Sequence, residues 1–214
     1  FHDGTDFDAS DVKFSLDRVR FIRYQAAQYL ENVDRIEKVD DKTVDIILKD
    51  PTEPLLTILA APSFSITDSK AVAERGGVAT PDSKEKDKAT DWLTQNSVGT
   101  GMYKLTGWLR NSQIQLVANP NYWGGKPPFQ RVVIRHFEDS ASQSLALKRG
   151  DIDCAFNLIP EQVAALKDEK DIWIASADSL DFVYLALTHN PEHNKALAIK
   201  QARQAVGYSL DYDG

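Results

Sequence analysis

The sequence predicts a mixed α/β fold, and three observations lead to that prediction. Apolar residues recur with a helical period at Val12, Leu16 and Val19. Two pairs of alternating segments, within residues 36–48 and 102–118, have the period of two that is typical of β-hairpins. From residue 131 onward, strand-like and helix-like segments follow one another, which favours an α/β layer with some parallel strand pairing.

The first part of the chain is expected to contain several short helices and one hairpin. Asp8 precedes the first helical pattern and can cap it. Pro62 stops a short helix that we expect to be buried, and Gly76-Gly77 ends another. In order, the expected elements are a helix after Asp8, a helix at 24–30, a hairpin at 36–48, and helices at 54–61 and 67–75.

Residues 80–91 (TPDSKEKDKATD) carry mixed charge and almost no apolar side chains. This composition is typical of a solvated connection, and it predicts a boundary between lobes.

The second part of the chain is expected to alternate between strands and helices. A second hairpin precedes a loop rich in proline and glycine that carries Tyr122 and Trp123. The strand at 182–187 is apolar on both faces, as expected for a central strand. The expected elements are strands at 102–105, 114–118, 131–137, 152–156, 172–175 and 182–187, and helices at 140–150, from Pro160, and at 196–210.

Composition excludes several classes of protein. Among 214 residues, 42% are hydrophobic, which is enough to bury a core. The 25 Lys+Arg against 32 Asp+Glu give a net charge of −7 without any run of basic residues, so a nucleic-acid partner is not expected. The longest apolar runs are far shorter than the roughly 20 residues that cross a bilayer. Cys154 is the single cysteine, which excludes an internal disulfide, and we expect it to be buried in a strand.

Neither end of the sequence has the features of a natural terminus. The chain starts with FHDGT, without an initiator methionine or a leader, and stops directly after a helical pattern. We expect both ends to be cut from a longer chain.

Motifs that suggest catalysis are weak. Gly99-Thr100-Gly101 has Lys104 where a dinucleotide fingerprint needs glycine, so a tight turn before a hairpin is the better interpretation. His189, Glu192 and His193 match the H-x-x-E-H pattern of some zinc peptidases, but Pro191 interrupts the helix which that chemistry requires. A zinc-dependent hydrolase that uses these three residues is kept as an alternative interpretation. No cofactor is expected.

Four segments in order resemble the extracellular solute-binding proteins of family 5, the peptide, dipeptide and nickel receptors of ABC importers. Residues 1–16 (FHDGTDFDASDVKFSL) resemble F-x-D-G-T-P-F-x-A-x-D-V-x-F-S-L, with Asp6 in place of proline. Residues 98–105 (VGTGMYKL) are similar to V-G-T-G-P-Y-K-L, followed by Trp108 and by NPNYW at 119–123. Residues 146–153 (ALKRGDID) resemble A-L-x-x-G-x-I-D, and residues 202–206 (ARQAV) resemble V-R-Q-A-(I/L).

The resemblance implies a partial periplasmic-binding-protein-like class II fold from two lobes of one hinged receptor. Residues 1–92 would be a small inserted domain, 93–188 part of lobe I, and 189–214 the start of lobe III. The implied function is to capture oligopeptides or dipeptides outside the cytoplasmic membrane, at the periplasmic or cell-surface side, and to deliver them to a membrane permease. The full-length protein would be a monomer and not an enzyme, and a receptor for nickel, haem or sugars is a narrower alternative.

The resemblance also implies ligand contacts. In peptide-binding relatives the stretch after GDID lines the pocket, which makes Phe156 and Asn157 the first candidates. Tyr184 would lie on a wall of the pocket, and Tyr29 and Ser63 are candidates from the small domain. Phe156 and Tyr184 have a competing interpretation as core residues. Trp108, Tyr122 and Trp123 are expected in the core of the lobe or covering it, and Gly99 and Gly101 are expected to supply positive φ angles or a close backbone approach.

Overall fold

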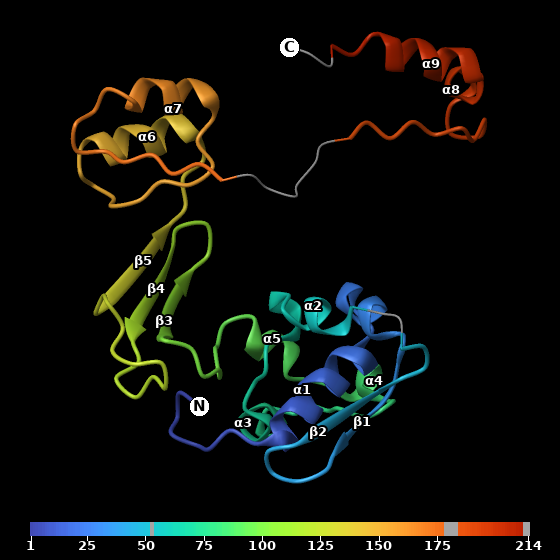
Figure 1. Ribbon diagram of the computed structural model, residues 1–214, viewed down its shortest axis with the longest axis vertical. Helices are drawn as coiled ribbons and strands as arrows, with labels where there is room; N and C mark the ends of the chain where they lie inside the picture. The colour runs from blue at the N-terminus through green and yellow to red at the C-terminus, as the bar shows by residue number, and fades with distance from the viewer. Residues whose placement is uncertain (52–53, 178–183, 212–214) are drawn as a thin grey trace. The chain divides into compact units, whose positions relative to one another are not determined.

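The computed structural model describes residues 1–51, 54–177 and 184–211. The chain forms two compact units, Phe1–Gln143 and Ser144–Gly214 (Figure 1). The domain boundaries predicted near residues 92 and 188 do not coincide with the division between these units, and they remain predictions.

The first helix, α1 (Ala9–Ile22), begins where the sequence predicts. The Asp8 carboxylate accepts a hydrogen bond from the Ser10 amide, and the Asp8 amide in turn donates to Asp11 Oδ2 at 2.9 Å. This reciprocal arrangement satisfies amide groups that a helix start leaves unpaired. The helix ends at Arg23, which has a left-handed φ of 62°.

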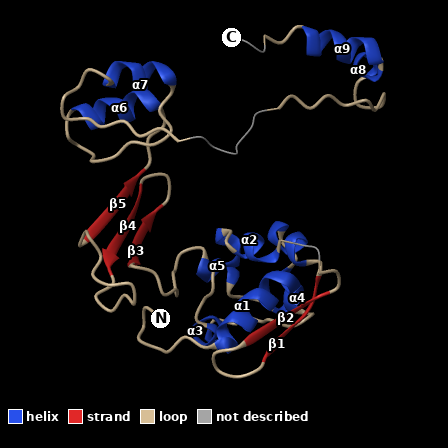
Figure 2. Cartoon of the chain, viewed as in Figure 1, coloured by secondary structure: helices blue, strands red, loops and turns tan. Residues whose placement is uncertain are grey.

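A two-stranded antiparallel hairpin packs against α1 and forms the core of this unit (Figure 2). Its strands are β1 (Val33–Lys38) and β2 (Val44–Leu48), in the register Lys38 opposite Val44, and the predicted hairpin is confirmed. The 3₁₀ helix η1 (Gln25–Leu30) connects α1 to β1, where the sequence predicts a helical stretch. The buried core residues are Leu16, Leu30, Val33, Ile36 and Phe64.

The helix predicted at 54–61 forms as α2 (Leu55–Leu59), but the expectation that it is buried is wrong. Leu55, Ile58 and Leu59 lie partly buried against the core, whereas Leu56 is exposed. A helix places residues three and four apart on the same face, so only one side of α2 can face the core. Pro62 begins the 3₁₀ turn η2 (Pro62–Phe64), which inserts Phe64 into the core.

Helix α3 (Ser69–Glu74) confirms the element predicted at 67–75. Asp68 caps it through two hydrogen bonds of 2.9 Å, from the amides of Lys70 and Ala71. The helix ends at Gly76, whose φ of +83° a residue with a side chain rarely adopts.

The prediction that residues 80–91 form a solvated connection is wrong. This stretch contains α4 (Ser83–Lys86) and the start of α5 (Thr90–Leu93), and both Ser83 and Ala89 are fully buried. Its charges hold it in place, because Asp87 forms an ion pair with Arg18 of α1. At Asp87, therefore, the charge serves a specific pairing in the fold.

A three-stranded sheet in the order β3–β4–β5 completes the first unit. Its strands are β3 (Tyr103–Leu109), β4 (Gln113–Ala118) and β5 (Arg131–Arg135), which confirms the predicted strands at these places. Every pair is antiparallel, so the expected parallel pairing is wrong for the described residues. The β4–β5 connection is a loop without a helix, and it returns the chain in the opposite direction instead of crossing over.

The glycines of the GTG segment have a different role from the expected one. Neither Gly99 nor Gly101 has a positive φ, and no heavy atom beyond their own chain neighbours lies closer than 3.9 Å to a Cβ built on either. Their carbonyl groups instead accept hydrogen bonds from His2, from its amide to Gly99 at 3.0 Å and from its Nε2 to Gly101 at 2.9 Å. Of the aromatic residues expected in the core or covering it, Trp108 and Trp123 are exposed and Tyr122 is half-buried.

The regular elements described in the second unit are helices, of which α6 (Ser140–Lys148) begins in the first unit. Helices α6 and α7 are held together by a hydrogen bond of 3.1 Å from Lys148 to the Ala165 carbonyl, and both confirm predicted helices. The predicted closing helix is interrupted at Ile199, whose backbone is extended, and forms two helices. The bounds are α6 (Ser140–Lys148), α7 (Pro160–Leu166), α8 (Lys195–Ala198) and α9 (Lys200–Tyr208).

The strands predicted in this unit do not form at 152–156, 172–175 or 184–187, and residues 182–183 lie outside the described residues. A strand needs a partner for its backbone groups, and no other described segment pairs with these stretches. Cys154 is accordingly exposed, not buried as expected. None of the described helices is both long and apolar enough to cross a membrane.

Candidate functional site

Two of the predicted site residues, Tyr29 and Ser63, line the same pocket of the first unit. The pocket has a volume of about 370 Å³, within the range of roughly 300–1,000 Å³ typical of small-ligand sites. It lies between η1 on one side and α2 with η2 on the other. Its lining residues are Gln25, Ala26, Gln28, Tyr29, Thr57, Ile58, Ala61, Ser63 and Phe64.

Local structure explains why these side chains line the pocket. Leu30 is buried in the core and fixes the end of η1, which leaves Tyr29 exposed at the surface. In a 3₁₀ helix residues three apart are eclipsed, so Gln25 and Gln28 share a face. On the opposite wall, the buried ring of Phe64 anchors η2 and holds Ser63 at the rim.

A second hollow of about 290 Å³ adjoins the first, since Ala26 and Ser63 line both. Its lining is more apolar, with Val19, Ile22 and Leu93 prominent. Its remaining lining residues are Arg18, Tyr24, Thr90 and Thr94. The two hollows together offer hydrogen-bonding groups on one side and apolar surface on the other.

The first pocket is electrically neutral in its described lining. Two amides, two hydroxyl groups and the phenol of Tyr29 supply its polar groups. These groups both donate and accept hydrogen bonds, which suits uncharged polar ligand atoms such as those of a peptide backbone. The described lining provides no nucleophile with a neighbouring base.

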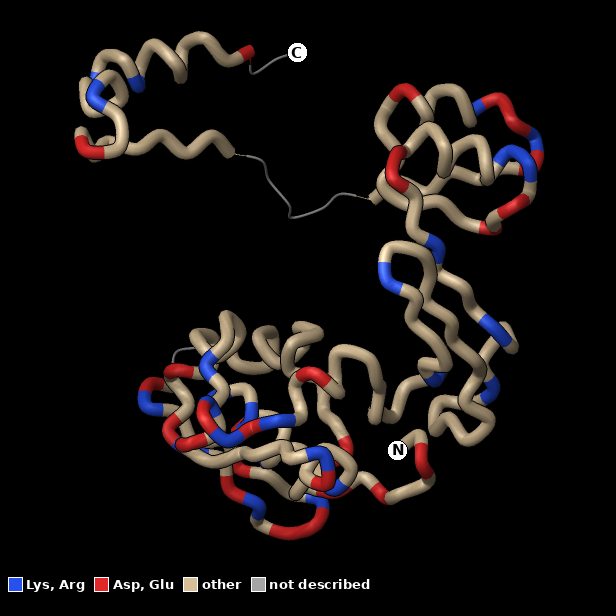
Figure 3. Tube along the Cα trace, turned by 180° about the vertical axis from the view of Figure 1, so that it is seen from behind, with Lys and Arg blue, Asp and Glu red and all other residues tan. Residues whose placement is uncertain are grey.

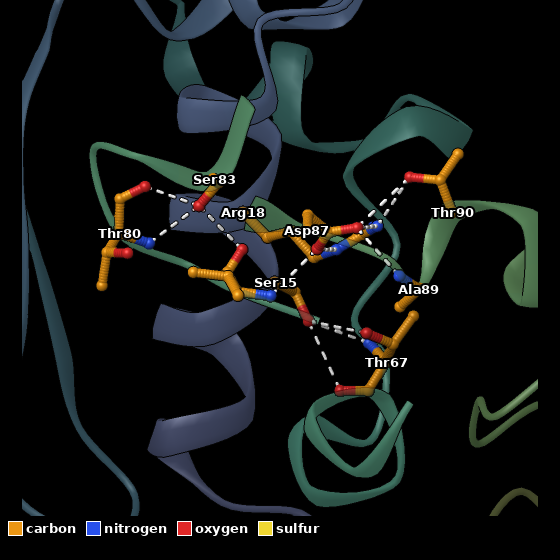
Figure 4. Close-up of polar contacts among 9 residues, drawn as sticks. Ser15, Arg18, Thr67, Thr80, Ser83, Asp87, Ala89 and Thr90 are labelled. Atoms are coloured by element: carbon orange, nitrogen blue, oxygen red, sulfur yellow. Dashed lines mark hydrogen bonds and ion pairs between the residues drawn. The ribbon is translucent and has the colours of Figure 1, made fainter. Parts of the chain in front are cut away.

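A buried polar network fixes the wall of the second hollow (Figure 4). Arg18 binds Asp87 through Nε to Oδ2 at 2.7 Å and Nη2 to Oδ1 at 2.8 Å, and donates to the Thr90 hydroxyl at 3.1 Å. Ser15 links α1 to the segment before α3, because its hydroxyl accepts the Thr67 amide at 3.0 Å. The positive charge of Arg18 is thus compensated within the protein.

The electrostatics of Asp87 reflect this network. Burial alone would raise the pKa of Asp87, but hydrogen bonds from Arg18 and from the Val78 amide, together with the charge of Arg18, hold the pKa below its ordinary value. Asp87 is therefore ionised at neutral pH and remains paired with Arg18.

Phe156 and Asn157 lie in the second unit, in the irregular segment between α6 and α7. Phe156 is 72% exposed, so its interpretation as a core residue is wrong. Asn157 has a φ of 58°, a left-handed conformation that is uncommon for a residue with a side chain. The strand that was expected to present these two residues is absent, and they lie in an irregular stretch with a bend at Asn157.

Tyr184 also belongs to the second unit and is 73% exposed, so its interpretation as a core residue is also wrong. The structure thus brings together Tyr29 and Ser63, whereas the other three candidates belong to a different unit.

The residues of the zinc alternative do not lie on a helix. Residues 191–193 form a turn, in which the Glu192 amide donates to Asn190 Oδ1 at 2.9 Å. Within the described ranges no group of three or more His, Cys, Asp or Glu side chains is arranged to hold a metal ion. The hydrolase hypothesis therefore gains no support.

Sequence reasoning missed Gln25, Gln28 and Thr57 as pocket residues. The spacing of the two glutamines, three apart in a short helical stretch, is a signal that could have identified them. Thr57 carries no such signal, because its place follows from the packing of α2 beside η1.

Solved structures define the class of fold. The chain matches the crystal structure of NikZ from Campylobacter jejuni in complex with Ni(L-His), with a TM-score of 0.79 and 24% identity, over 98% of this chain and 39% of that one. It also matches the ABC transporter-associated periplasmic binding protein DppA from Helicobacter pylori in complex with the peptide STSA. That match has a TM-score of 0.61 and 27% identity, over 76% of this chain and 32% of that one. The fold is that of a periplasmic binding protein.

Sequence comparison identifies the family. The sequence model described as "Bacterial extracellular solute-binding proteins, family 5 Middle" matches residues 1–214, and the chain belongs to this family. It is 36% identical to the "Probable D,D-dipeptide-binding periplasmic protein DdpA" of Escherichia coli (strain K12), over 100% of this chain and 39% of that protein. It is 28% identical to the glutathione-binding protein GsiB of Escherichia coli O1:K1 / APEC, over 99% of this chain and 38% of that protein. The chain therefore spans well under half the length of these relatives.

Proposed function

We propose that the protein carrying this chain is the substrate-binding component of an ABC importer and captures dipeptides or oligopeptides. The observation that carries this proposal is the agreement of three relatives whose ligands are peptides. One is named for D,D-dipeptides, one for glutathione, and one was solved with a bound peptide. The neutral, hydrogen-bonding pocket around Tyr29 and Ser63 supports the same ligand class.

The proposed ligand contacts come from both units. Tyr29 and Ser63 present a phenol and a hydroxyl at the first pocket. Phe156 and Tyr184 expose aromatic rings that can cover a peptide side chain, and Asn157 has the uncommon backbone conformation often found at binding sites.

The proposal extends to location and partners. The protein works outside the cytoplasmic membrane, passes its ligand unchanged to a membrane permease, and is a monomer. No covalent step is involved, which agrees with a described pocket lining made of amides, hydroxyls and a phenol.

Titration calorimetry on the full protein that carries this chain tests the ligand class. The ligands are D-alanyl-D-alanine, L-alanyl-L-alanine, glutathione, the tetrapeptide STSA and the complex of Ni²⁺ with L-histidine. We expect at least one peptide to bind with a Kd of about 1 μM or tighter. Binding of the nickel complex alone, or of no peptide, would refute the proposal.

The site assignment is tested with Tyr29→Ala and Ser63→Ala. Loss of a hydrogen bond should weaken binding of the best peptide about tenfold. Tyr208→Ala is the matched control, because Tyr208 is an exposed tyrosine of α9 outside both pockets. An equal loss of affinity in the control would remove the first pocket from the site.

A further inference from the structure

The two segments that form the walls of the first pocket carry no charged residue. Residues 24–30 (YQAAQYL) and 54–67 (PLLTILAAPSFSIT) contain no Asp, Glu, Lys or Arg, although the chain has 25 Lys+Arg and 32 Asp+Glu. Figure 3 draws both segments in tan, whereas the rest of this unit carries many red and blue positions. All described lining residues of the first pocket come from these two segments, so the pocket offers no charge to a ligand.

The polar side chains of the first pocket are available to a ligand. Within the part of the chain that the structure describes, none of them forms a hydrogen bond with another residue. These side chains belong to Gln25, Gln28, Tyr29, Thr57 and Ser63. Amides and hydroxyl groups both donate and accept hydrogen bonds, and so do the N–H and C=O groups of a peptide backbone. A peptide backbone can therefore replace the water at these groups.

The second hollow differs, because its main polar side chains are already satisfied within the protein. The Arg18 guanidinium pairs with Asp87, and the Thr90 hydroxyl accepts from Arg18 and donates to Asp87 Oδ1 at 3.3 Å. The Thr94 hydroxyl donates to the Asp91 carbonyl at 2.7 Å. Apart from Ser63, which lines both hollows, the remaining lining is apolar or aromatic: Val19, Ile22, Tyr24, Ala26 and Leu93. The second hollow therefore suits an apolar group.

The two hollows adjoin at Ala26 and Ser63, which line both. Hydrogen-bonding groups on one side of this boundary thus lie next to an apolar lining on the other side. A residue within a peptide combines the same two features, because its backbone groups are polar and uncharged and its side chain can be apolar. The continuity of the two hollows therefore allows one residue to use both.

We propose that the two hollows together bind one internal residue of a peptide, with its backbone in the first pocket and an apolar side chain in the second hollow. This inference rests on the proposed function, and it adds which part of the ligand is held here. A terminal residue would bring its ammonium or carboxylate group into an uncharged pocket, where it would lose hydration without gaining a counter-charge. A charged side chain would meet the same penalty in the second hollow, because Asp87 already pairs with Arg18.

The test is titration calorimetry of the full protein that carries this chain with four tripeptides of L-residues, Ala-Xaa-Ala. The central residue is leucine, alanine, asparagine or aspartate, and it is the only internal residue of each ligand. We expect the leucine tripeptide to bind about tenfold more tightly than the alanine tripeptide, because its side chain leaves water for the second hollow. The asparagine tripeptide should bind no more tightly than the alanine one, and the aspartate tripeptide should bind most weakly.

The outcomes separate this inference from the proposed function. If the tripeptides bind but leucine has no advantage over asparagine, or aspartate binds as tightly as leucine, the inference is wrong and the proposed function stands. Binding of dipeptides without binding of any tripeptide would also overturn the inference, because no internal residue would then be held. If no peptide binds at all, the proposed function fails, and this inference fails with it.

A variant of α5 assigns the side-chain preference to the second hollow. Leu93→Ala removes apolar lining there, so the ratio of affinities for the leucine and alanine tripeptides should fall about threefold. Leu105→Ala is the matched control, because Leu105 is a half-buried leucine of β3 outside both hollows, and it should leave the ratio unchanged. Both ligands are measured on the same variant, so a loss of folded protein does not alter the ratio. An unchanged ratio in Leu93→Ala, or equal falls in both variants, would overturn the assignment.

A variant of α2 tests the placement of the peptide backbone. Thr57→Val removes a hydroxyl group from the first pocket with little change of shape. Because the backbone is common to all four tripeptides, their affinities should fall by one similar factor of about threefold to tenfold, and the preference for leucine should persist. Unchanged affinities, or a loss that depends on the central residue, would contradict a backbone bound in the first pocket.

Discussion

Arg18 and Asp87, which are 69 positions apart in the sequence, form a bidentate ion pair. Their side chains are only 15% and 3% exposed. Asp87 also accepts the amides of Val78 at 2.9 Å and Ala89 at 3.1 Å, so one carboxylate fastens the segment 78–90 to α1. This pair therefore positions Thr90 in the wall of the second hollow.

Asp87→Asn should strongly destabilise the protein. The substitution keeps the shape but leaves the charge of Arg18 buried without its partner, and removing one member of a buried pair costs about 3 kcal/mol. Urea unfolding measures this loss. Asp34→Asn is the control, because Asp34 pairs with Arg35 at the surface, and its effect should be much smaller. Equal effects would show that the Arg18–Asp87 pair is not important for stability.

The contribution of Asp87 should also depend on pH. Its pKa in the folded protein lies below the ordinary value of 3.8, so between the two pKa values the unfolded chain binds more protons. The stability it provides is fully present above that ordinary value and is lost as pH falls through the folded pKa. We expect the difference in unfolding free energy between wild type and Asp87→Asn to be large at pH 7 and to shrink below about pH 4. A difference independent of pH would contradict this account.

Asp68→Ala should destabilise the start of α3. Asp68 is 2% exposed, caps two amides of α3 through Oδ1, and accepts the Thr5 hydroxyl at Oδ2 at 2.7 Å. Its removal leaves buried amides unpaired, which costs about 2 kcal/mol. Thr5→Val removes the bond from the Thr5 hydroxyl to Asp68 and leaves the two capping bonds in place. In thermal unfolding, the Thr5→Val variant should therefore be clearly more stable than the Asp68→Ala variant. The reverse order would contradict the capping role.

Gly77 and Gly99 should respond differently to substitution by alanine. A Cβ at Gly77 would lie 2.4 Å from Val72 Cγ1 and 2.8 Å from the Val72 carbonyl oxygen, so Gly77→Ala should cost about 1–3 kcal/mol. Gly99 has open space and no positive φ, so Gly99→Ala should change stability by less than about 0.5 kcal/mol. Chemical denaturation of both variants measures these changes in the free energy of unfolding. Strong destabilisation by Gly99→Ala would restore the conformational role that the sequence suggests for it.

Elements that depend on local interactions are predictable from this sequence. Asp8 caps α1 through residues two and three positions away, and Gly76 ends α3 by its own backbone freedom. Elements that depend on distant partners are not. The sequence of residues 80–91 does not predict the ion pair between Asp87 and Arg18. The apolar pattern of residues 152–156 does not predict whether another strand pairs with this stretch.

Some residues of the candidate site are likewise predictable from the sequence, and others are not. Tyr29 and Ser63 follow from the family resemblance, and the structure places them in one pocket. Thr57 was not predicted, because its place in the pocket depends on how α2 packs beside η1 and not on any pattern in the sequence.

The sheet pattern has a consequence for the order in which the chain folds. β1 pairs with β2, β3 with β4, and β4 with β5, so every described ladder joins strands that are consecutive along the chain. Short loops close rapidly, and a hairpin forms in about 1–10 μs. The contact between Arg18 and Asp87 must instead close a long loop, so its formation belongs to a late step of folding. The hairpins can therefore act as early nuclei, onto which the segment from Val78 to Leu93 docks afterwards.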